Sequence, residues 1–214
     1  MKIQHKIHRF ALCGGAMAYS AGILAEAIMG WKLDPRITLL SESAAKDRRD
    51  RRIYQGGDIV AGALFLAAGV AAQPPSATLL RWPLASLGAA TIVDALSPLD
   101  YPITHRQLNA AAAEGRKQPS ATHRTHFATT GVAGLATAAI CLIDWRERTG
   151  GTSSVRRFAG PAVVLGQLAG LVSLASPRLV PGAVQRIQTL GFSALCIDLA
   201  RRGLARSDSM HPQA

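Results

Sequence analysis

Six long segments of the chain are built almost entirely from Ala, Gly, Leu, Val and Ile, and they constrain its fold more than any other feature. Stretches such as residues 132–143 and 162–175 do not alternate apolar and polar residues at the period of an amphipathic helix or a strand. A helix that is apolar on all sides either lies in a large core or spans a lipid bilayer. A chain of 214 residues is too small to bury six such helices from water. The sequence therefore predicts an all-α fold, a single integral membrane domain with six transmembrane helices at residues 10–31, 58–73, 79–97, 126–145, 158–176 and 181–200.

Some segments are short for a membrane helix, which needs about 20 apolar residues to cross a hydrocarbon core of roughly 30 Å. The second segment can also be interpreted as a re-entrant or interfacial helix, although local thinning of the bilayer absorbs such a mismatch. The first segment follows the basic residues 1–9, as in a signal peptide. Its length, and Glu26 near its end, argue against cleavage.

The orientation rests on the basic flanks of the segments. Residues 1–9, 146–157 and 201–206 are basic with few acids, which favours cytoplasmic tails and both termini inside the cell. The bare count does not decide, because this topology places 11 of the 24 Lys and Arg residues on the inner side.

The net charge of +11 could indicate a protein that binds nucleic acid. The bases are spread over short connections and form no nucleic-acid-binding motif, so we predict no nucleic-acid partner. Membrane lipids are the predicted partners, because anionic headgroups attract basic residues near the membrane surface. Gly166 and Gly170 form a small-xxx-small pattern that favours close helix packing and hints at a homodimer.

In this topology the ionisable and strongly polar groups of the apolar segments gather on the outer side. A charge at the centre of a membrane helix costs about 2.5–3.5 kcal/mol on insertion scales, so such a cluster needs partners or a function. The candidate acid/base residues are Asp94, Asp100, His123 and His126. The candidate substrate-binding residues are Glu26, Asp58, His105, Gln185 and Arg186.

Each of these residues also has a structural interpretation. Asp58 follows two glycines and can cap a helix, where a carboxylate accepts free N–H groups. Asp94 lies within an apolar run, and Arg186 is the counter-charge that we expect it to pair with. Glu26 lies close enough to the interface to reach water.

The histidines invite a metal interpretation, which we do not adopt. His123 and His126 are three residues apart and would share a helical face, so with Asp94 or Asp100 they could form a zinc-like site. No H-E-x-x-H or comparable signature is present. We predict no metal and no cofactor.

Several short motifs occur together in order, namely Asp34-Pro35-Arg36, Leu40-Ser41-Glu42, Ser97-Pro98-Leu99-Asp100, His123 with His126, and Gly182-Ala183-Val184-Gln185-Arg186. This ordered set resembles the bacterial membrane proteins of the domain-of-unknown-function 998 family. The resemblance covers nearly the whole chain and implies a multi-pass protein of the bacterial inner membrane, with the motifs on the extracytoplasmic side. Ser97 stands where the family usually has an aromatic residue, and the family usually has one histidine before the fourth helix. The resemblance implies no activity.

Three functions are compatible with these features. The one we favour is a non-catalytic accessory or lipid-interacting membrane protein. The alternatives are an intramembrane enzyme that acts on a lipid or isoprenoid-like substrate by acid/base chemistry, and a small transporter. If the polar residues form a pocket, Asp94, Asp100, one of the two histidines and Arg186 should face a common cavity open to the outer leaflet.

Overall fold

The computed structural model describes residues 2–72, 78–104, 118–147, 158–174 and 177–209. Within these ranges the chain forms α-helices and two short 3-10 helices, and no strand. The helices are α1 (Lys2–Ile28), η1 (Leu40–Ala44), α2 (Arg51–Ala71), α3 (Thr78–Leu96), α5 (Ala121–Glu147), α7 (Ala159–Ser173), η3 (Pro177–Leu179) and α8 (Pro181–Ser209). The predicted all-α fold and the six predicted helices are therefore confirmed for the described part of the chain.

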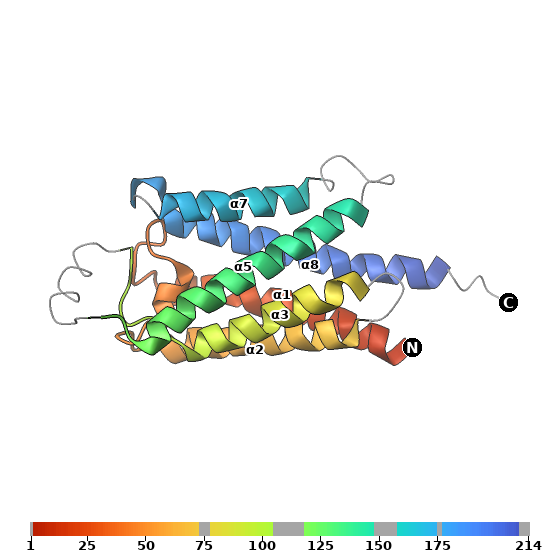
Figure 1. Ribbon diagram of the computed structural model, residues 1–214, viewed down its shortest axis with the longest axis horizontal. Helices are drawn as coiled ribbons and strands as arrows, with labels where there is room; N and C mark the ends of the chain where they lie inside the picture. The colour runs from red at the N-terminus through yellow and green to blue at the C-terminus, as the bar shows by residue number, and fades with distance from the viewer. Residues whose placement is uncertain (1, 73–77, 105–117, 148–157, 175–176, 210–214) are drawn as a thin grey trace.

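The six α-helices form a closed ring. Each packs against its neighbour in sequence, from α1 to α2, α3, α5, α7 and α8, and α8 closes the ring against α1. Both termini lie at one end of the molecule, and the connection from α1 to α2 lies at the opposite end (Figure 1). We call this opposite end the loop end. It carries the first connection (residues 29–50) and the described part of the second connection (residues 97–104 and 118–120).

Three helices begin before the predicted apolar segments. α1 begins at Lys2, α2 at Arg51 and α5 at Ala121, where we predicted starts at residues 10, 58 and 126. The added turns carry Arg, Lys, Gln and His, and the long polar side chains among these lose little freedom in a helix. Asp58 consequently lies inside α2, and the interpretation of this residue as a helix cap is wrong.

Three aromatic side chains join three helices in the middle of the bundle. Tyr19 of α1 makes edge contacts with Phe65 of α2 and Phe192 of α8, with ring centroids 5.9 and 6.0 Å apart. Phe65 and Phe192 are fully buried. Edge-to-face pairs of this kind contribute about 0.5–1.5 kcal/mol beyond the buried area. The rings therefore hold α1, α2 and α8 in one core.

Small residues set the closest helix approaches. A Cβ atom on Gly62 of α2 would lie 2.7 Å from the carbonyl oxygen of Gly88 on α3, so these backbones are in direct contact. Gly166 and Gly170 of α7 face the side chains of Gln188 and Val184 on α8. The small-xxx-small face of α7 thus packs against α8 of the same chain. It no longer supports the homodimer, which stays a prediction.

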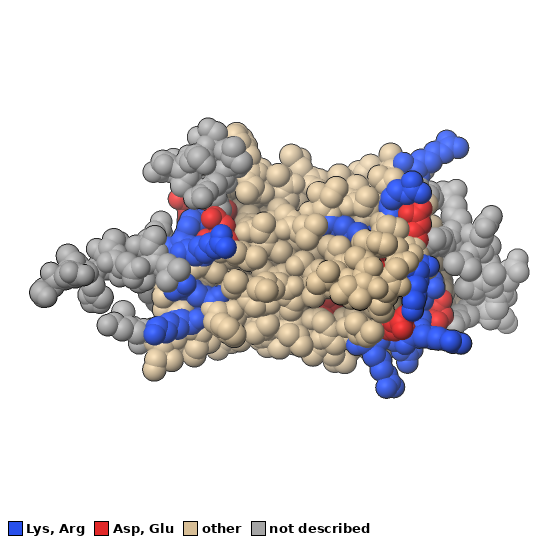
Figure 2. All heavy atoms as spheres, turned by 180° about the vertical axis from the view of Figure 1, so that it is seen from behind, with Lys and Arg blue, Asp and Glu red and all other residues tan. Residues whose placement is uncertain are grey.

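The surface between the two ends is apolar. Large side chains such as Leu135 and Leu171 are 75% and 67% exposed. Lys, Arg, Asp and Glu gather at the two ends of the face shown in Figure 2, and a nearly uncharged band separates them. Helices α1, α2, α3 and α5 are long and apolar enough to cross a membrane, and α7 is a shorter apolar helix.

Candidate functional site: the polar network at the loop end

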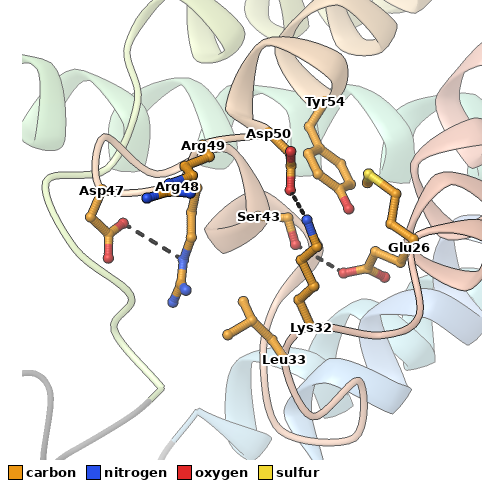
Figure 3. Close-up of a pocket in the computed structure, with 10 residues that line it drawn as sticks. Glu26, Lys32, Leu33, Ser43, Asp47, Arg48, Arg49, Asp50 and Tyr54 are labelled. Carbon is orange, nitrogen blue, oxygen red and sulfur yellow. Dashed lines mark hydrogen bonds and ion pairs between the residues drawn. The ribbon is translucent and has the colours of Figure 1, made fainter.

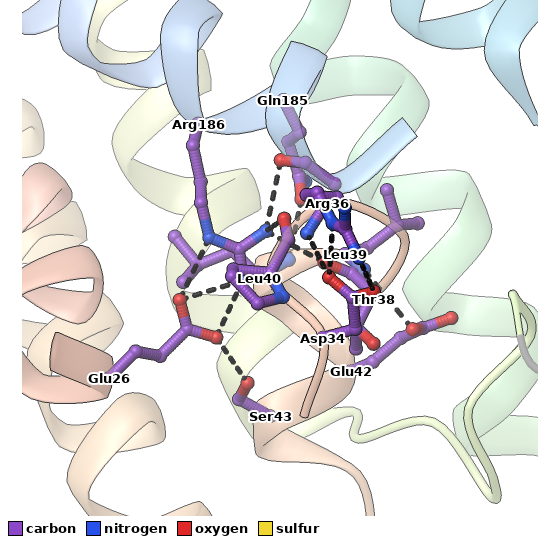
Figure 4. Close-up of polar contacts among 12 residues, drawn as sticks. Glu26, Asp34, Arg36, Thr38, Leu39, Leu40, Glu42, Ser43, Gln185 and Arg186 are labelled. Carbon is purple, nitrogen blue, oxygen red and sulfur yellow. Dashed lines mark hydrogen bonds and ion pairs between the residues drawn. The ribbon is translucent and has the colours of Figure 1, made fainter. Parts of the chain in front are cut away.

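An ion pair between the first and last helices lies at the centre of the loop end. Arg186 of α8 donates from Nε and Nη2 to both carboxylate oxygens of Glu26 on α1, over 2.6–2.9 Å (Figure 4). Both side chains are more than nine-tenths buried. Ser43 of η1 donates a further hydrogen bond to Glu26, over 2.9 Å. A two-pronged contact of this kind fixes the geometry as well as the charge.

The remaining nitrogen of Arg186 holds the first connection against α8. Its Nη1 donates to the carbonyl oxygens of Pro35 and Thr38, each over 2.7 Å, and to that of Gly182 over 2.9 Å. A Cβ atom on Gly182 would collide with the carbonyl oxygens of Thr38 and Pro35. The motif from Gly182 to Arg186 therefore holds the first connection in two ways. Gly182 leaves room for its carbonyl groups, and the guanidinium of Arg186, one helical turn later, donates hydrogen bonds to them.

Gln185 adds a second link between α8 and the same connection. Its Oε1 accepts a hydrogen bond of 2.6 Å from the backbone N–H of Leu40. The N–H of Leu40 belongs to the start of η1, so Gln185 satisfies a backbone donor that the short helix leaves free.

Glu42 was not among the predicted site residues, yet it joins the two connections. Its carboxylate is fully buried and accepts from the N–H groups of Ile103 and Thr104 over 2.6 and 2.8 Å. It also accepts from the hydroxyl of Thr104 over 2.6 Å and from the N–H of Leu39 over 3.1 Å. The sequence signal for this role is the apolar setting of Glu42 within an otherwise charged connection.

Asp100 anchors the second connection to the first connection and to α5. It accepts from Lys46 Nζ over 2.7 Å, from the Ser120 N–H over 2.8 Å and from the Ser120 hydroxyl over 2.7 Å. Its own N–H donates to Nδ1 of His123 over 3.1 Å. Burial alone raises the pKa of a carboxyl group, but the hydrogen bonds from Lys46 and Ser120 and the Lys46 charge outweigh it and hold the pKa of Asp100 well below its ordinary value.

Asp94 and His126 form a separate group one turn further into the bundle. Asp94 Oδ1 accepts from the hydroxyls of Thr129 and Thr130 over 2.6 and 3.1 Å. Nδ1 of His126 lies 3.2 Å from the same oxygen, but the angle does not make a hydrogen bond, and this buried nitrogen has no other hydrogen-bond partner among the described residues. The two groups are therefore adjacent, without a hydrogen bond between them.

A small cavity of about 230 Å³ opens at the loop end (Figure 3). Basic, acidic and apolar side chains line it, namely Glu26, Met29, Lys32, Leu33, Ser43, Asp47, Arg48, Arg49, Asp50 and Tyr54. Lys32 lies across the cavity with its ammonium 2.5 Å from Asp50, and Arg48 lies 3.7 Å from Asp47. Arg49, which also lines the cavity, is exposed.

The predicted pairing of Asp94 with Arg186 is wrong, because Arg186 pairs with Glu26, and α8 packs against α1. Of the predicted site residues, Glu26 lines the cavity of about 230 Å³, and Asp94, Asp100 and Arg186 do not. The common cavity predicted for these three residues is therefore not this one.

The predicted histidines separate as well. His123 lies beside Asp100 and His126 beside Asp94. Among the described residues no three His, Cys, Asp or Glu side chains come together closely enough to hold a metal ion, so the alternative zinc-like site is not formed there. His105 lies outside the described residues.

Comparison with known proteins gives one match. No curated protein and no solved structure matches the chain. The model of the family described as "Protein of unknown function (DUF998)" matches residues 12–202. That range runs from the first turns of α1 to Arg202 in α8 and includes every residue of the network at the loop end. The chain belongs to the DUF998 family.

Proposed function

We propose that the chain is an integral protein of the bacterial inner membrane, that all six α-helices cross the bilayer, and that the loop end faces the extracytoplasmic side. In this proposal the protein is not an enzyme, and the cavity at the loop end binds the headgroup of a phospholipid. The four long apolar helices and the nearly uncharged band between the charged ends support insertion. α7 has 15 residues, or about 22 Å of helix, and local thinning of the bilayer accommodates it.

The pairing of the buried charges argues against acid/base catalysis at this end. Glu26, Glu42 and Asp100 each accept several hydrogen bonds from groups of the protein itself. A catalytic acid or base has to reach the proton of a substrate within about 2.6–3.2 Å. These three carboxylates instead join α1, α8 and the two connections, which is a structural role.

The composition and size of the cavity carry the proposal. Arg48 and Arg49 can bind a phosphate, and Asp47 can bind an ammonium group, whereas Asp50 is already paired with Lys32. The walls therefore match both charges of a zwitterionic headgroup. Met29 and Leu33 provide apolar surface for the glycerol end. A volume of about 230 Å³ is below the roughly 300–1,000 Å³ of pockets that enclose a whole ligand. A headgroup fits this cavity while its acyl chains remain in the bilayer.

The test uses the purified full chain in detergent, titrated with short-chain phosphatidylethanolamine and followed by native mass spectrometry. Arg48→Ala and Arg49→Ala should each weaken lipid retention by about tenfold, since a hydrogen bond to a charged group contributes roughly 1.5–3 kcal/mol. Arg52→Ala is the matched control, because Arg52 is exposed, carries the same charge and does not line the cavity. Equal retention by all three variants would contradict the headgroup site.

A further inference from the structure

An open groove of about 580 Å³ runs along the surface of the bundle between α7 and α8, which lie side by side (Figure 1). Most of the side chains that line it are apolar and several are small, among them Ala159, Ala162 and Gly166 of α7 and Gly191 and Ala194 of α8. Ala162 and Ala194 are exposed. The small residues therefore leave a space at the surface that longer side chains would fill.

The two polar residues of the lining leave most of the groove apolar. Gln188 turns aliphatic carbons toward α7, since a Cβ atom on Gly166 would lie 3.5 Å from Gln188 Cβ. Asp198 lies at the end of the groove that is far from the loop end, and it accepts a hydrogen bond of 3.0 Å from Arg202. Arg202 also donates to the buried carboxylate of Asp144 on α5. The charge of Asp198 is thus already paired.

The dimensions of the groove fit one hydrocarbon chain. Its lining on α8 extends from Val184 to Asp198, which is about 21 Å of helix. A volume of about 580 Å³ over that length gives a mean cross-section of roughly 28 Å². A helix with its side chains is about 10 Å wide, or roughly 80 Å² in section, and would not enter the groove. Carbon atoms in contact lie about 3.5–4.0 Å apart, so an extended acyl chain does enter it.

The end of the groove at Asp198 lies where aromatic side chains are exposed. Phe158 directly precedes Ala159 of the lining, and Trp145 lies at the end of the neighbouring helix α5, and both are exposed. Exposed Trp side chains are typical of the interface between hydrocarbon and headgroups. In the proposed topology this is the cytoplasmic interface. The groove therefore extends from the headgroup level into the hydrocarbon core, as the acyl chain of a phospholipid does.

An exposed cation lies at the same end. Arg201 follows Asp198 by three residues, which places it one turn further along the same face of α8. Arg201 is exposed, whereas the adjacent Arg202 is engaged with two carboxylates. A guanidinium group can bind a phosphate through two parallel hydrogen bonds. This end of the groove thus combines an apolar entrance with a charge that matches a phosphate.

We propose that the groove between α7 and α8 binds one acyl chain of a phospholipid of the cytoplasmic leaflet, whose phosphate binds Arg201. An empty groove in the membrane would forfeit van der Waals contacts, because no water enters the hydrocarbon core to fill it. The acyl chain restores these contacts. This inference rests on the membrane insertion proposed above, but not on the headgroup site, which lies at the opposite end of the bundle.

Photochemical cross-linking of the full chain in lipid nanodiscs tests the proposal. The discs contain phosphatidylethanolamine and, as the probe, a small fraction of phosphatidylglycerol with a diazirine in the middle of one acyl chain. After illumination, mass spectrometry of peptides should find the cross-links concentrated on residues 159–166 and 187–195. Ala194→Phe should fill the groove and remove most of them. Ala89→Phe is the matched control, because Ala89 is exposed on α3 and does not line the groove.

A second pair of variants tests the phosphate contact. Arg201→Gln should lower the yield of cross-links in the groove by about tenfold, since a hydrogen bond to a charged group contributes at least that factor. Arg81→Gln is the control, because Arg81 is exposed at the start of α3, at the same end of the bundle. An unchanged yield in Arg201→Gln would overturn the phosphate contact.

Three further results would overturn the inference. Cross-links spread evenly over the exposed faces of all helices, or equal yields in Ala194→Phe and Ala89→Phe, would show that the groove retains no lipid. A doubled mass in native mass spectrometry, without cross-links in the groove, would show that a second copy covers it. Failure of the chain to insert into the discs would contradict membrane insertion itself, whereas the other results leave insertion and the headgroup site untouched.

Discussion

Glu26 and Arg186 are 160 residues apart in sequence, yet their carboxylate and guanidinium groups lie 2.6 Å apart. The pair joins the end of α1 to the start of α8, the contact that closes the ring of helices. The same guanidinium holds the backbone of the first connection through the carbonyl groups of Pro35 and Thr38. One residue therefore fixes both the closure of the ring and the position of the connection that lines the cavity.

Breaking this pair should destabilise the protein strongly. Glu26→Gln and Arg186→Ala should each lower the free energy of unfolding in detergent by about 3–5 kcal/mol, because each leaves a buried charge without its partner. The double variant should lose clearly less than the sum of the two. A parallel cycle with Asp94→Asn and Arg186→Ala should be close to additive, and strong coupling there would contradict the observed pairing.

Arg186→Lys should also be destabilising, although it keeps the charge. The guanidinium of Arg186 donates to Glu26 and to three carbonyl groups from three nitrogens, and the ammonium of a lysine cannot reproduce this planar arrangement. The melting temperature of Arg186→Lys should lie closer to that of Arg186→Ala than to that of the wild type. A wild-type melting temperature would show that only the charge matters.

Gly182→Ala should disturb the contact between α8 and the first connection. The added methyl group would collide with the carbonyl oxygens of Thr38 and Pro35, and overpacking of this kind costs about 1–3 kcal/mol. Gly131→Ala in α5 is the control, since nothing lies within 4 Å of its Cβ position and alanine favours a helix. Equal effects of the two substitutions on unfolding would contradict the tight contact at Gly182.

The stability of the protein should fall in acid partly through Asp100. The pKa of Asp100 is lower in the folded protein than in the unfolded chain, so the folded state favours the charged form. Its contribution is therefore fully present above the unfolded value of about 3.9 and is lost as the pH falls through the folded-state pKa. Asp100→Asn should lower the melting temperature at pH 7 and lose less than the wild type between pH 5 and pH 2. A parallel pH profile for both proteins would contradict this assignment.

The sequence was sufficient to predict the helices and the end at which the polar residues gather. Runs that are apolar on all sides can be recognised without knowledge of the fold. Because successive membrane helices run in opposite directions, their order in the sequence indicates which helix ends lie on the same side. The starts of α1, α2 and α5 were missed because their first turns are polar and carry no apolar pattern.

The partners within the network could not be predicted. A helix that is apolar on all sides does not show which face meets which neighbour. We therefore expected Arg186 to pair with Asp94 and Glu26 to reach water, whereas Arg186 pairs with Glu26. The choice depends on α8 packing against α1, a contact between distant parts of the sequence. Glu42 was missed because its backbone donors, Ile103 and Thr104, are 61 and 62 residues away and backbone N–H groups leave no mark in a sequence.

In the proposed topology the network and the cavity lie on the extracytoplasmic surface of a membrane-spanning bundle. Cysteine labelling tests it directly, after replacement of the free thiols of Cys13, Cys141 and Cys196 by alanine. Asp47→Cys places an exposed thiol beside the cavity, and Arg146→Cys places one at the opposite end of α5. In intact cells a membrane-impermeant maleimide should label Asp47→Cys, and it should label Arg146→Cys only after permeabilisation. Labelling in the reverse order would contradict the proposed orientation, and recovery of the protein outside the membrane fraction would contradict membrane insertion.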